Sequence, residues 1–301
     1  MFDIWRVGYV RRPLAQLAFA PIAASEIRWL PPRESFQYDA DPFPIIREGV
    51  LTIFVEAFDY RVRRGEIHFY QYDAGDRLIR QGVALAEPFH LSYPALIEEE
   101  SELYMVPEGY KSGGLNLYRC VRFPDRWERV ARIADFPAID ATLIRHAGRW
   151  WMFHALPGPH DQAMRELHVA YADTLTGPWT PHPGGAVMTG RTLSRPGGTA
   201  FVHDGVPHLP VQDCTDTYGQ AITLLRIDVL TPDRFRARPV HRLEPAGLLP
   251  GFEDGLHTLS GGPEVTCIDV KGIRRSRAEG TIRTQYKLRR LFGLNGPQVR
   301  S

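Results

Sequence analysis

A repeat of roughly 50 residues constrains this chain more than any other feature of its sequence. Each copy has a β-prone run, a short turn such as Glu-Gly, Ala-Gly or Asp-Gly, and a second β-prone run. Aligning "ADPFPIIREGVLTIFVEAF" (40–58) with "SYPALIEEESELYMVPEGY" (92–110) superimposes proline on proline and glutamate on glutamate. Two β-prone runs joined by a tight turn indicate a β-hairpin.

Three further copies complete the series: "IDATLIRHAGRWWMFHAL" (139–156), "SRPGGTAFVHDGVPHLPVQD" (194–213) and "GLHTLSGGPEVTCIDVKG" (255–272). One four-stranded blade of a β-propeller has about this length. The sequence therefore predicts an all-β fold, a five-bladed β-propeller over residues 30–272. We expect residues 1–29 to pack on the propeller or to close its last blade. Residues 273–301 are expected to form a basic tail.

The residues that lead the five copies are candidates for a functional site. The innermost strands of a propeller line its central channel, so these leading residues should meet around one axis. They are Asp41, Tyr93, Asp140, Arg195 and His257. A carboxylate at the mouth of a channel avoids the cost of burying a charge. The repeat thus predicts a polar funnel.

Composition excludes several other classes of protein. Hydrophobic residues make up 44% of the 301 residues, so the chain is globular, and a net charge of +1 gives no drive toward nucleic acid. The three cysteines are scattered and form no zinc-binding or disulfide pattern. The N-terminal apolar runs are short and interrupted by charges, which argues against a secretory signal. We expect a cytoplasmic monomer.

Several motifs in the same order carry a family resemblance over roughly residues 30–272. They are "ADPF", "HLSYPALIEEESELYMVPE", "DATLIRHAGRWW", "SRPGG", "PVQDCTDTYG" and "HTLSG". They resemble the N-terminal domain of plant glucosamine inositolphosphorylceramide transferase and its bacterial single-domain relatives. The chain also looks like family 43 glycoside hydrolases, which are five-bladed propellers acting on furanosides and pyranosides. The chemistry of the plant transferase belongs to a separate domain, of which this sequence shows no trace.

The family 43 resemblance implies inverting hydrolysis by three acids. Asp41 matches the base, and Asp140 matches the aspartate that tunes pKa and position. Where the family has its general acid, a glutamate, this chain has Arg195. Inversion needs two carboxyl groups roughly 6.5–9.5 Å apart, one of them protonated. Glu108, at the end of a second strand, is our substitute for the acid.

Other residues are assigned to substrate binding with alternatives left open. Glu56 occupies the repeat position of Glu108, and Asp213 ends the matching strand of the fourth copy. Tyr93 is a candidate to stack on a sugar ring. Arg195 either holds a substrate carboxylate or phosphate, or pairs with Asp41 or Asp140 across the funnel. His257 is a ligand contact, a metal-facing residue or a structural histidine.

The expected function is a carbohydrate-active enzyme that cleaves or transfers a glycosidic bond in polysaccharide or glycolipid metabolism. The missing glutamate keeps an alternative open, namely a non-catalytic glycan-binding or scaffolding propeller in envelope polysaccharide assembly. No cofactor is required, although His257 and the acids permit a structural cation in the channel. The segment 271–301 has nine Lys or Arg residues against one Glu. It predicts either a solvated end or contact with an anionic inner-membrane surface.

Overall fold

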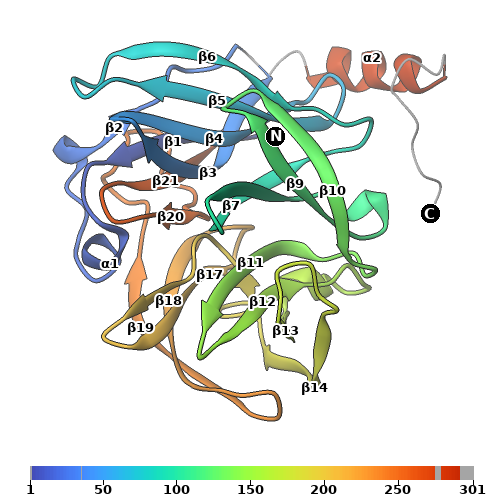
Figure 1. The fold of residues 1–301 in the computed structure, drawn as a ribbon. Helices are drawn as coiled ribbons and strands as arrows, with labels where there is room; N and C mark the ends of the chain where they lie inside the picture. Colours follow the sequence, from blue (N-terminus) through green and yellow to red (C-terminus); the bar gives the residue numbers. More distant parts are fainter. Residues whose placement is uncertain (1, 35, 275–278, 292–301) are drawn as a thin grey trace.

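The computed structural model describes residues 2–34, 36–274 and 279–291, and confirms the five-bladed β-propeller (Figure 1). Four blades follow one another along the chain. The strands of the first two blades are β3 (Gln37–Arg47), β4 (Val50–Asp59), β5 (Arg64–Tyr72) and β6 (Leu78–Leu85), then β7 (Ser92–Glu99), β8 (Glu102–Glu108), β9 (Leu115–Arg122) and β10 (Arg126–Ala134).

The third and fourth blades have the same antiparallel order, with an inner strand that is split in the fourth. Their strands are β11 (Ile139–His146), β12 (Arg149–Ala155), β13 (Glu166–Ala172) and β14 (Thr180–Thr189), then β15 (Arg195–Pro196), β16 (Phe201–His203), β17 (Val206–Asp213), β18 (Ala221–Leu230) and β19 (Phe235–Leu243). Both β15 and β16 pair with β17.

The two ends of the chain build the fifth blade together. Its strand order is β2 (Arg28–Trp29), β1 (Phe2–Val10), β21 (Thr266–Arg274) and β20 (Leu259–Gly261). Strand β1 pairs with β21 from Phe2–Arg274 to Val10–Thr266, and Figure 1 shows these blue and orange strands side by side. The N-terminal segment, expected as residues 1–29, therefore contributes two strands to a blade. This pairing closes the ring.

The remaining elements are short, apart from one helix near the C-terminus. They are α1 (Leu14–Leu17), α2 (Glu279–Leu291) and three turns of 3₁₀-helix (Ala24–Glu26, Tyr110–Ser112 and Gln162–Met164). The tail expected at residues 273–301 thus begins within β21 and includes α2, while residues 275–278 and 292–301 lie outside the described part. No helix among the described residues is long and apolar enough to cross a membrane.

The hairpin turns explain how each blade repeats the same local geometry. In four blades the two residues between the inner strand and its neighbour both have positive φ. A two-residue β-hairpin of type I′ requires this backbone, and it disfavours most side chains other than Gly, Asn and Asp. The pairs are Glu48–Gly49, Glu100–Ser101, Ala147–Gly148 and Asp204–Gly205.

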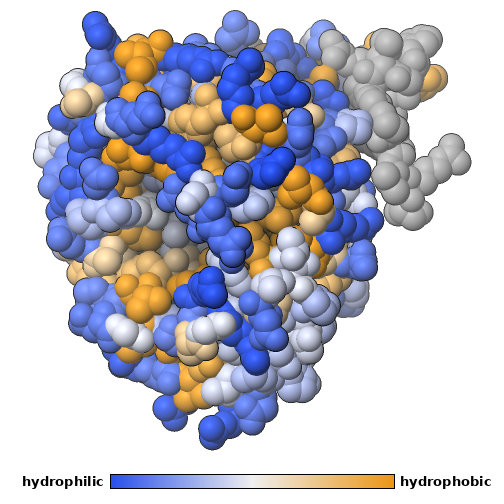
Figure 2. Space-filling model, in the orientation of Figure 1, coloured by the Kyte–Doolittle hydropathy of each residue, from blue (hydrophilic) through white to orange (hydrophobic). Residues whose placement is uncertain are grey.

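The hydrophobic core of the described residues consists mainly of five clusters, each lying between two neighbouring blades, and a small sixth cluster of Phe43, Tyr93 and Ala95 lies on the inner strands of the first two blades. Between the first and second blades, for example, Phe54 and Phe69 pack with Met105 and Tyr118. Equivalent clusters fill the other four junctions. Hydrophilic residues predominate on the face shown in Figure 2, with hydrophobic residues in small groups between them. Burial between blades fixes the inner strands around the axis, which is what positions the site.

Candidate active site

A β-bulge recurs at the leading residue of the first three blades. The pairing of β3 with β4 shifts register between Ala40 and Phe43, so Asp41 and Pro42 together oppose one residue. The same shift occurs at Tyr93 and at Asp140. The backbone angle φ is +48° at Asp41, +46° at Tyr93 and +49° at Asp140. This left-handed conformation is unfavourable for most residues other than glycine. Bulges re-aim side chains, and here they direct both aspartates toward the channel mouth.

The bulges surround a cavity of about 210 Å³. It brings together six of the eight residues expected at the site. Its lining comprises Trp5, Tyr38, Asp41, Glu56, Phe58, His90, Ser92, Glu108, Asp140, Arg195, Tyr218 and His257. Four carboxyl groups therefore meet one guanidinium and two histidines, His90 and His257, around one small cavity.

Asp41 is buried and well supplied with hydrogen-bond donors. Its Oδ2 accepts a bond from the Tyr93 backbone N–H at 3.2 Å, and its Oδ1 accepts one from the Thr258 hydroxyl at 3.0 Å. Burial raises the pKa of Asp41 to about 6, against the opposing effect of the nearby His257. A carboxyl group with this pKa changes its charge close to neutral pH, as a general base must.

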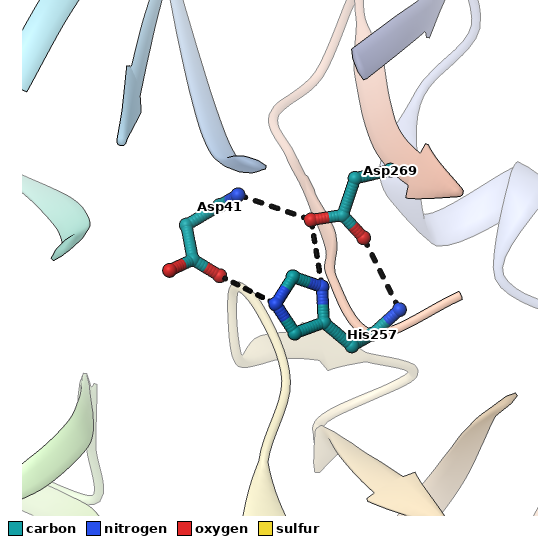
Figure 3. Close-up of side chains that lie close together, drawn as sticks. All are labelled: Asp41, His257 and Asp269. Atoms are coloured by element: carbon teal, nitrogen blue, oxygen red, sulfur yellow. Dashed lines mark hydrogen bonds and ion pairs between the residues drawn. The ribbon is translucent and has the colours of Figure 1, made fainter. Parts of the chain in front are cut away.

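Figure 3 shows that His257 lies between two carboxylates. Its Nε2 is 3.4 Å from Asp41 Oδ1, and its Nδ1 is 2.7 Å from Asp269 Oδ2. Burial opposes a charge on this ring, but the two carboxylates outweigh burial and raise the pKa of His257. The arrangement favours an imidazolium that bridges Asp269 and Asp41.

The same three side chains are the strongest candidates for a channel cation. One ligand atom from each lies within 4.8 Å of the others. However, Asp269 already accepts hydrogen bonds from the backbone N–H groups of Asp41, His257 and Thr258, in addition to its contact with the His257 ring. A metal would have to displace these donors. The donor set fits a hydrogen-bonded Asp–His–Asp chain, so no chemical step is assigned to a metal.

Arg195 pairs with Asp140, which is one of the two alternatives that the sequence left open. Its Nε lies 2.7 Å from Asp140 Oδ2, and Gln212 Nε2 donates to the same oxygen at 3.0 Å. The guanidinium also stacks over the Tyr218 ring at 5.1 Å. Since its charge is committed to protein acids, Arg195 is poorly placed to hold an anionic substrate.

Glu108 has the properties of a protonated acid. It is buried, and its Oε2 lies 3.4 Å from the Asp140 backbone N–H and 3.9 Å from an Arg195 terminal nitrogen. Burial and the neighbouring Asp140 carboxylate raise the pKa of Glu108 well above its usual value, which Arg195 only partly offsets. A carboxylic acid kept neutral near pH 7 can donate a proton to a leaving group.

Glu56 comes from the neighbouring strand of the first blade and is also buried. Burial, followed by repulsion from Asp41 and Glu108, raises the pKa of Glu56 well above its usual value. Its Oε1 lies 3.5 Å from His90 Nε2. Burial lowers the pKa of His90 to about 4, so this ring is neutral near pH 7.

Two expected site residues do not line the cavity. Tyr93 is fully buried, and its hydroxyl bonds to Thr142 and Gly198 inside the channel. It cannot stack on a sugar, and only its backbone N–H reaches the site. The prediction that Asp213 contacts the substrate does not fit the structure, because the Asp213 carboxylate lies outside the cavity and pairs with Arg242 at 2.7 Å. Successive side chains of a strand point to opposite faces, so its neighbour Gln212 is the one directed at Asp140.

Several residues in or beside the lining were not expected from the sequence. Asp269 lies on β21, the second strand of the weak fifth repeat, but it is the fourth residue of that strand, whereas Glu56 and Glu108 are each the seventh residue of theirs. The repeat therefore gave no signal for Asp269. Trp5 and Tyr218 had no signal either, because one lies in the N-terminal strand and the other in a loop after β17. Both rings pack on His257, with centroid distances of 3.8 and 5.4 Å.

Fold and site together define a five-bladed propeller with a buried acidic cavity at the mouth of its channel. The family model described as "Glucosamine inositolphosphorylceramide transferase 1, N-terminal" matches residues 30–244, and the chain belongs to this family. Two relatives carry the name glucosamine inositolphosphorylceramide transferase 1. The protein from Oryza sativa subsp. indica is 34% identical to this chain over 206 residues. The protein from Arabidopsis thaliana is 33% identical over 201 residues.

The relatives are much longer proteins. The match covers 67% and 65% of this chain but only 28% and 26% of the rice and Arabidopsis proteins. Solved structures show the same fold at low identity. The catalytic domain of a Coprinopsis cinerea GH62 α-L-arabinofuranosidase has a TM-score of 0.59 at 12% identity, covering 80% of this chain and 93% of that one. Zg3597, a family 117 glycoside hydrolase of Zobellia galactanivorans, has a TM-score of 0.55 at 12% identity. The match covers 93% of this chain and 98% of that one.

Proposed function

We propose that this protein is a carbohydrate-active enzyme that cleaves or transfers a glycosidic bond. The observation that carries the proposal is a pair of cavity carboxyl groups whose environments differ. Asp41 is next to a cationic His257, whereas Glu108 is next to the carboxylate of Asp140. Pairs of acids whose surroundings separate their pKa values are typical of general acid and base assignments.

In this proposal Asp41 acts as the base and Glu108 as the acid. Asp41 is ionised above about pH 6 and accepts a proton from the attacking water or sugar hydroxyl. Glu108 remains protonated and donates to the oxygen of the leaving group. Asp140 keeps that proton on Glu108 through its negative charge, and Arg195 holds Asp140 in place.

The cavity suits one sugar ring. Its volume of about 210 Å³ is below the roughly 300–1,000 Å³ of sites for drug-sized ligands. Aromatic rings of Tyr38, Phe58 and Tyr218 line it, and aromatic faces pack against the C–H groups of sugars. The family name and the glycoside hydrolase neighbours support a substrate from polysaccharide or glycolipid metabolism. The cytoplasmic location, the monomeric state and a membrane contact through the basic tail stay predictions.

A glycan-binding protein without turnover is the second candidate. Both oxygens of Asp41 already accept hydrogen bonds, from Tyr93 and Thr258. A carboxylate satisfied in this way is also a rigid acceptor for sugar hydroxyls. Binding of glycans without turnover by the unmodified chain would support this candidate against the enzyme.

A screen for turnover tests the enzyme. The purified chain is incubated with aryl glycosides, oligosaccharides and glycolipids, and released or transferred sugars are measured by mass spectrometry. On any active substrate, Asp41→Asn and Glu108→Gln should each lower kcat/KM by about 100-fold or more. Unchanged turnover in either variant would contradict the proposed roles.

Two matched controls accompany these variants. Asp204→Asn makes the same substitution at another positive-φ position, in the exposed β16–β17 turn. Glu48→Gln changes an exposed glutamate in the β3–β4 turn. Both controls should retain full activity, because neither residue lines the cavity.

A further inference from the structure

We propose that helix α2 docks on an anionic lipid surface and brings the channel mouth close to that surface. Docking of this kind does not depend on the proposed chemistry, because none of the residues that line the cavity is on α2. The helix also lies outside residues 30–244, the part of the chain that matches the family model. Three features of α2 carry the proposal: its charge, its exposed leucines and the place where it packs.

Positive charge is concentrated in the sequence of α2. Four of its 13 residues are basic and one is acidic. The basic residues are Arg283, Lys287, Arg289 and Arg290, and the acid is Glu279 at the start of the helix. The whole chain has a net charge of only +1, so α2 is a local excess of positive charge. Basic segments of this kind are attracted to the anionic lipids of a bilayer surface.

The two most exposed large hydrophobic side chains among the described residues are both on α2. They are Leu288 and Leu291, with exposed fractions of 49% and 80%. Lys287, which is also exposed, precedes Leu291 by about one helical turn, so basic and apolar residues share the exposed side of the helix. Helices that combine basic and apolar residues in this way lie in the headgroup region of anionic bilayers.

The other side of α2 packs on the propeller. Ile282 is buried, and the ring of Tyr286, one turn further along, lies 4.7 Å from the guanidinium carbon of Arg63. Ile282 and Leu291 are about two and a half helical turns apart, so they project from opposite sides. The contacts that hold α2 on the propeller therefore leave Leu291 exposed to a partner.

Arg63 places α2 at the cavity end of the first blade. It lies in the turn between β4 and β5, just after the cavity-lining residues Glu56 and Phe58 of β4. The β3–β4 turn, at Glu48 and Gly49, is at the opposite end of the same strand. Figure 1 shows α2 at the edge of the ring of blades. A lipid surface bound by α2 would therefore approach the channel mouth and not the far end of the channel.

Nucleic acid fits this surface less well than a bilayer does. It is bound mainly through its phosphates, which would pair with the basic residues but would leave Leu288 and Leu291 in water. An anionic bilayer accepts both kinds of side chain, since its headgroups attract the basic residues and its acyl region takes up the leucines.

Vesicle flotation of the full chain tests the docking. The probes are vesicles of phosphatidylcholine alone and of phosphatidylcholine mixed with phosphatidylglycerol. We expect binding to the anionic vesicles to be at least about tenfold tighter at low salt and to weaken as salt is added. Equal binding to both vesicles, no binding to either, or binding to a DNA duplex as tight as to the anionic vesicles would overturn the proposal.

Two variants assign the binding to α2. Lys287→Glu reverses an exposed charge, and a double variant, Leu288→Ser with Leu291→Ser, removes the exposed leucines. Each should weaken binding to the anionic vesicles by about tenfold. Circular dichroism and thermal unfolding verify that both variants are folded. Undiminished binding in both variants would overturn the proposal.

Matched controls change similar side chains far from α2. Arg236→Glu makes the same change in charge on β19, the outer strand of the fourth blade, where Arg236 is exposed. Ile79→Ser with Val202→Ser removes two exposed apolar side chains, from β6 and β16. Both controls should bind like the unmodified chain, because the surface that they alter does not face the bilayer.

Amide hydrogen exchange on the anionic vesicles tests the orientation. Exchange should slow across α2 and the β4–β5 turn at residues 60–63, and should not change at Glu48 and Gly49. Protection at the far-end turn instead would overturn the proposed orientation. Turnover that depends on Asp41 without vesicle binding would leave the enzyme intact. Conversely, vesicle binding that depends on Lys287, with no turnover of any glycoside, would support the docking and overturn the enzyme.

Discussion

The guanidinium Nε of Arg195 lies 2.7 Å from Oδ2 of Asp140, and this contact organises one side of the cavity. Arg195 occupies the repeat position at which the family 43 resemblance expected a glutamate. Because it pairs with Asp140 and not with Asp41, it leaves the candidate base free of a guanidinium. The acid function then falls to Glu108, which lies beside the same pair.

Breaking this pair should be costly. Arg195→Gln would leave Asp140 buried without its cation, and we expect the free energy of unfolding to fall by about 3–5 kcal/mol in urea denaturation. Adding Asp140→Asn should recover part of the loss, with a coupling energy of about 1–3 kcal/mol. Simple additivity of the two changes would contradict a direct pair. As a control, Arg242→Gln removes a more exposed guanidinium from Asp213 and should cost less.

Asp41 should make stability depend on pH in a predictable direction. Its pKa is about 6 in the folded protein and near 3.8 when unfolded. Between these values the unfolded chain has released a proton that the folded protein still binds, so unfolding becomes easier as pH rises. The unfolding free energy of the wild type minus that of Asp41→Asn should fall by about 2 kcal/mol between pH 4 and 6. A flat or rising difference would show that the pKa is not raised.

His257 should control the charge of Asp41. His257→Asn keeps a side-chain donor near Asp269 but removes the cation, which favours the ionised form of Asp41. The pKa of Asp41 should therefore rise above about 6 in the variant, as measured by carbon-13 NMR of the carboxyl group. His203→Asn, in the exposed β16–β17 hairpin, is the control and should have no effect. A pKa that stays constant or falls in His257→Asn would rule out the electrostatic role.

Lys271 should hold the loop that carries Tyr218. The lysine is fully buried, and its Nζ donates to the Thr217 hydroxyl at 2.8 Å and to the Tyr218 carbonyl at 2.5 Å. Lys271→Met removes these bonds, so amide hydrogen exchange across residues 214–220 should accelerate while the other blades stay protected. Lys111→Met, at an exposed site, should change nothing. Unaltered exchange in Lys271→Met would mean that the loop is held by other contacts.

The sequence repeat predicted most of the fold. Its hairpin turns and its five copies predicted the blades, because turn residues and the alternation of apolar and polar residues in a strand depend on residues that are close together in the sequence. The same repeat predicted that Asp41, Asp140 and Arg195 meet at one axis, because the leading residues of the copies hold equivalent positions in their blades. It also included Glu108, because second-strand ends repeat at the same spacing.

Tertiary structure decided the details that depend on strand faces and on ring closure. Register on β17 directs Gln212 and not Asp213 at the cavity, since a one-residue offset reverses the face of a strand. Closure of the fifth blade by β1 brings Trp5 onto His257. Contacts between residues more than 200 positions apart, such as Asp41 with Asp269, leave no local pattern, because only burial between packed blades brings them together.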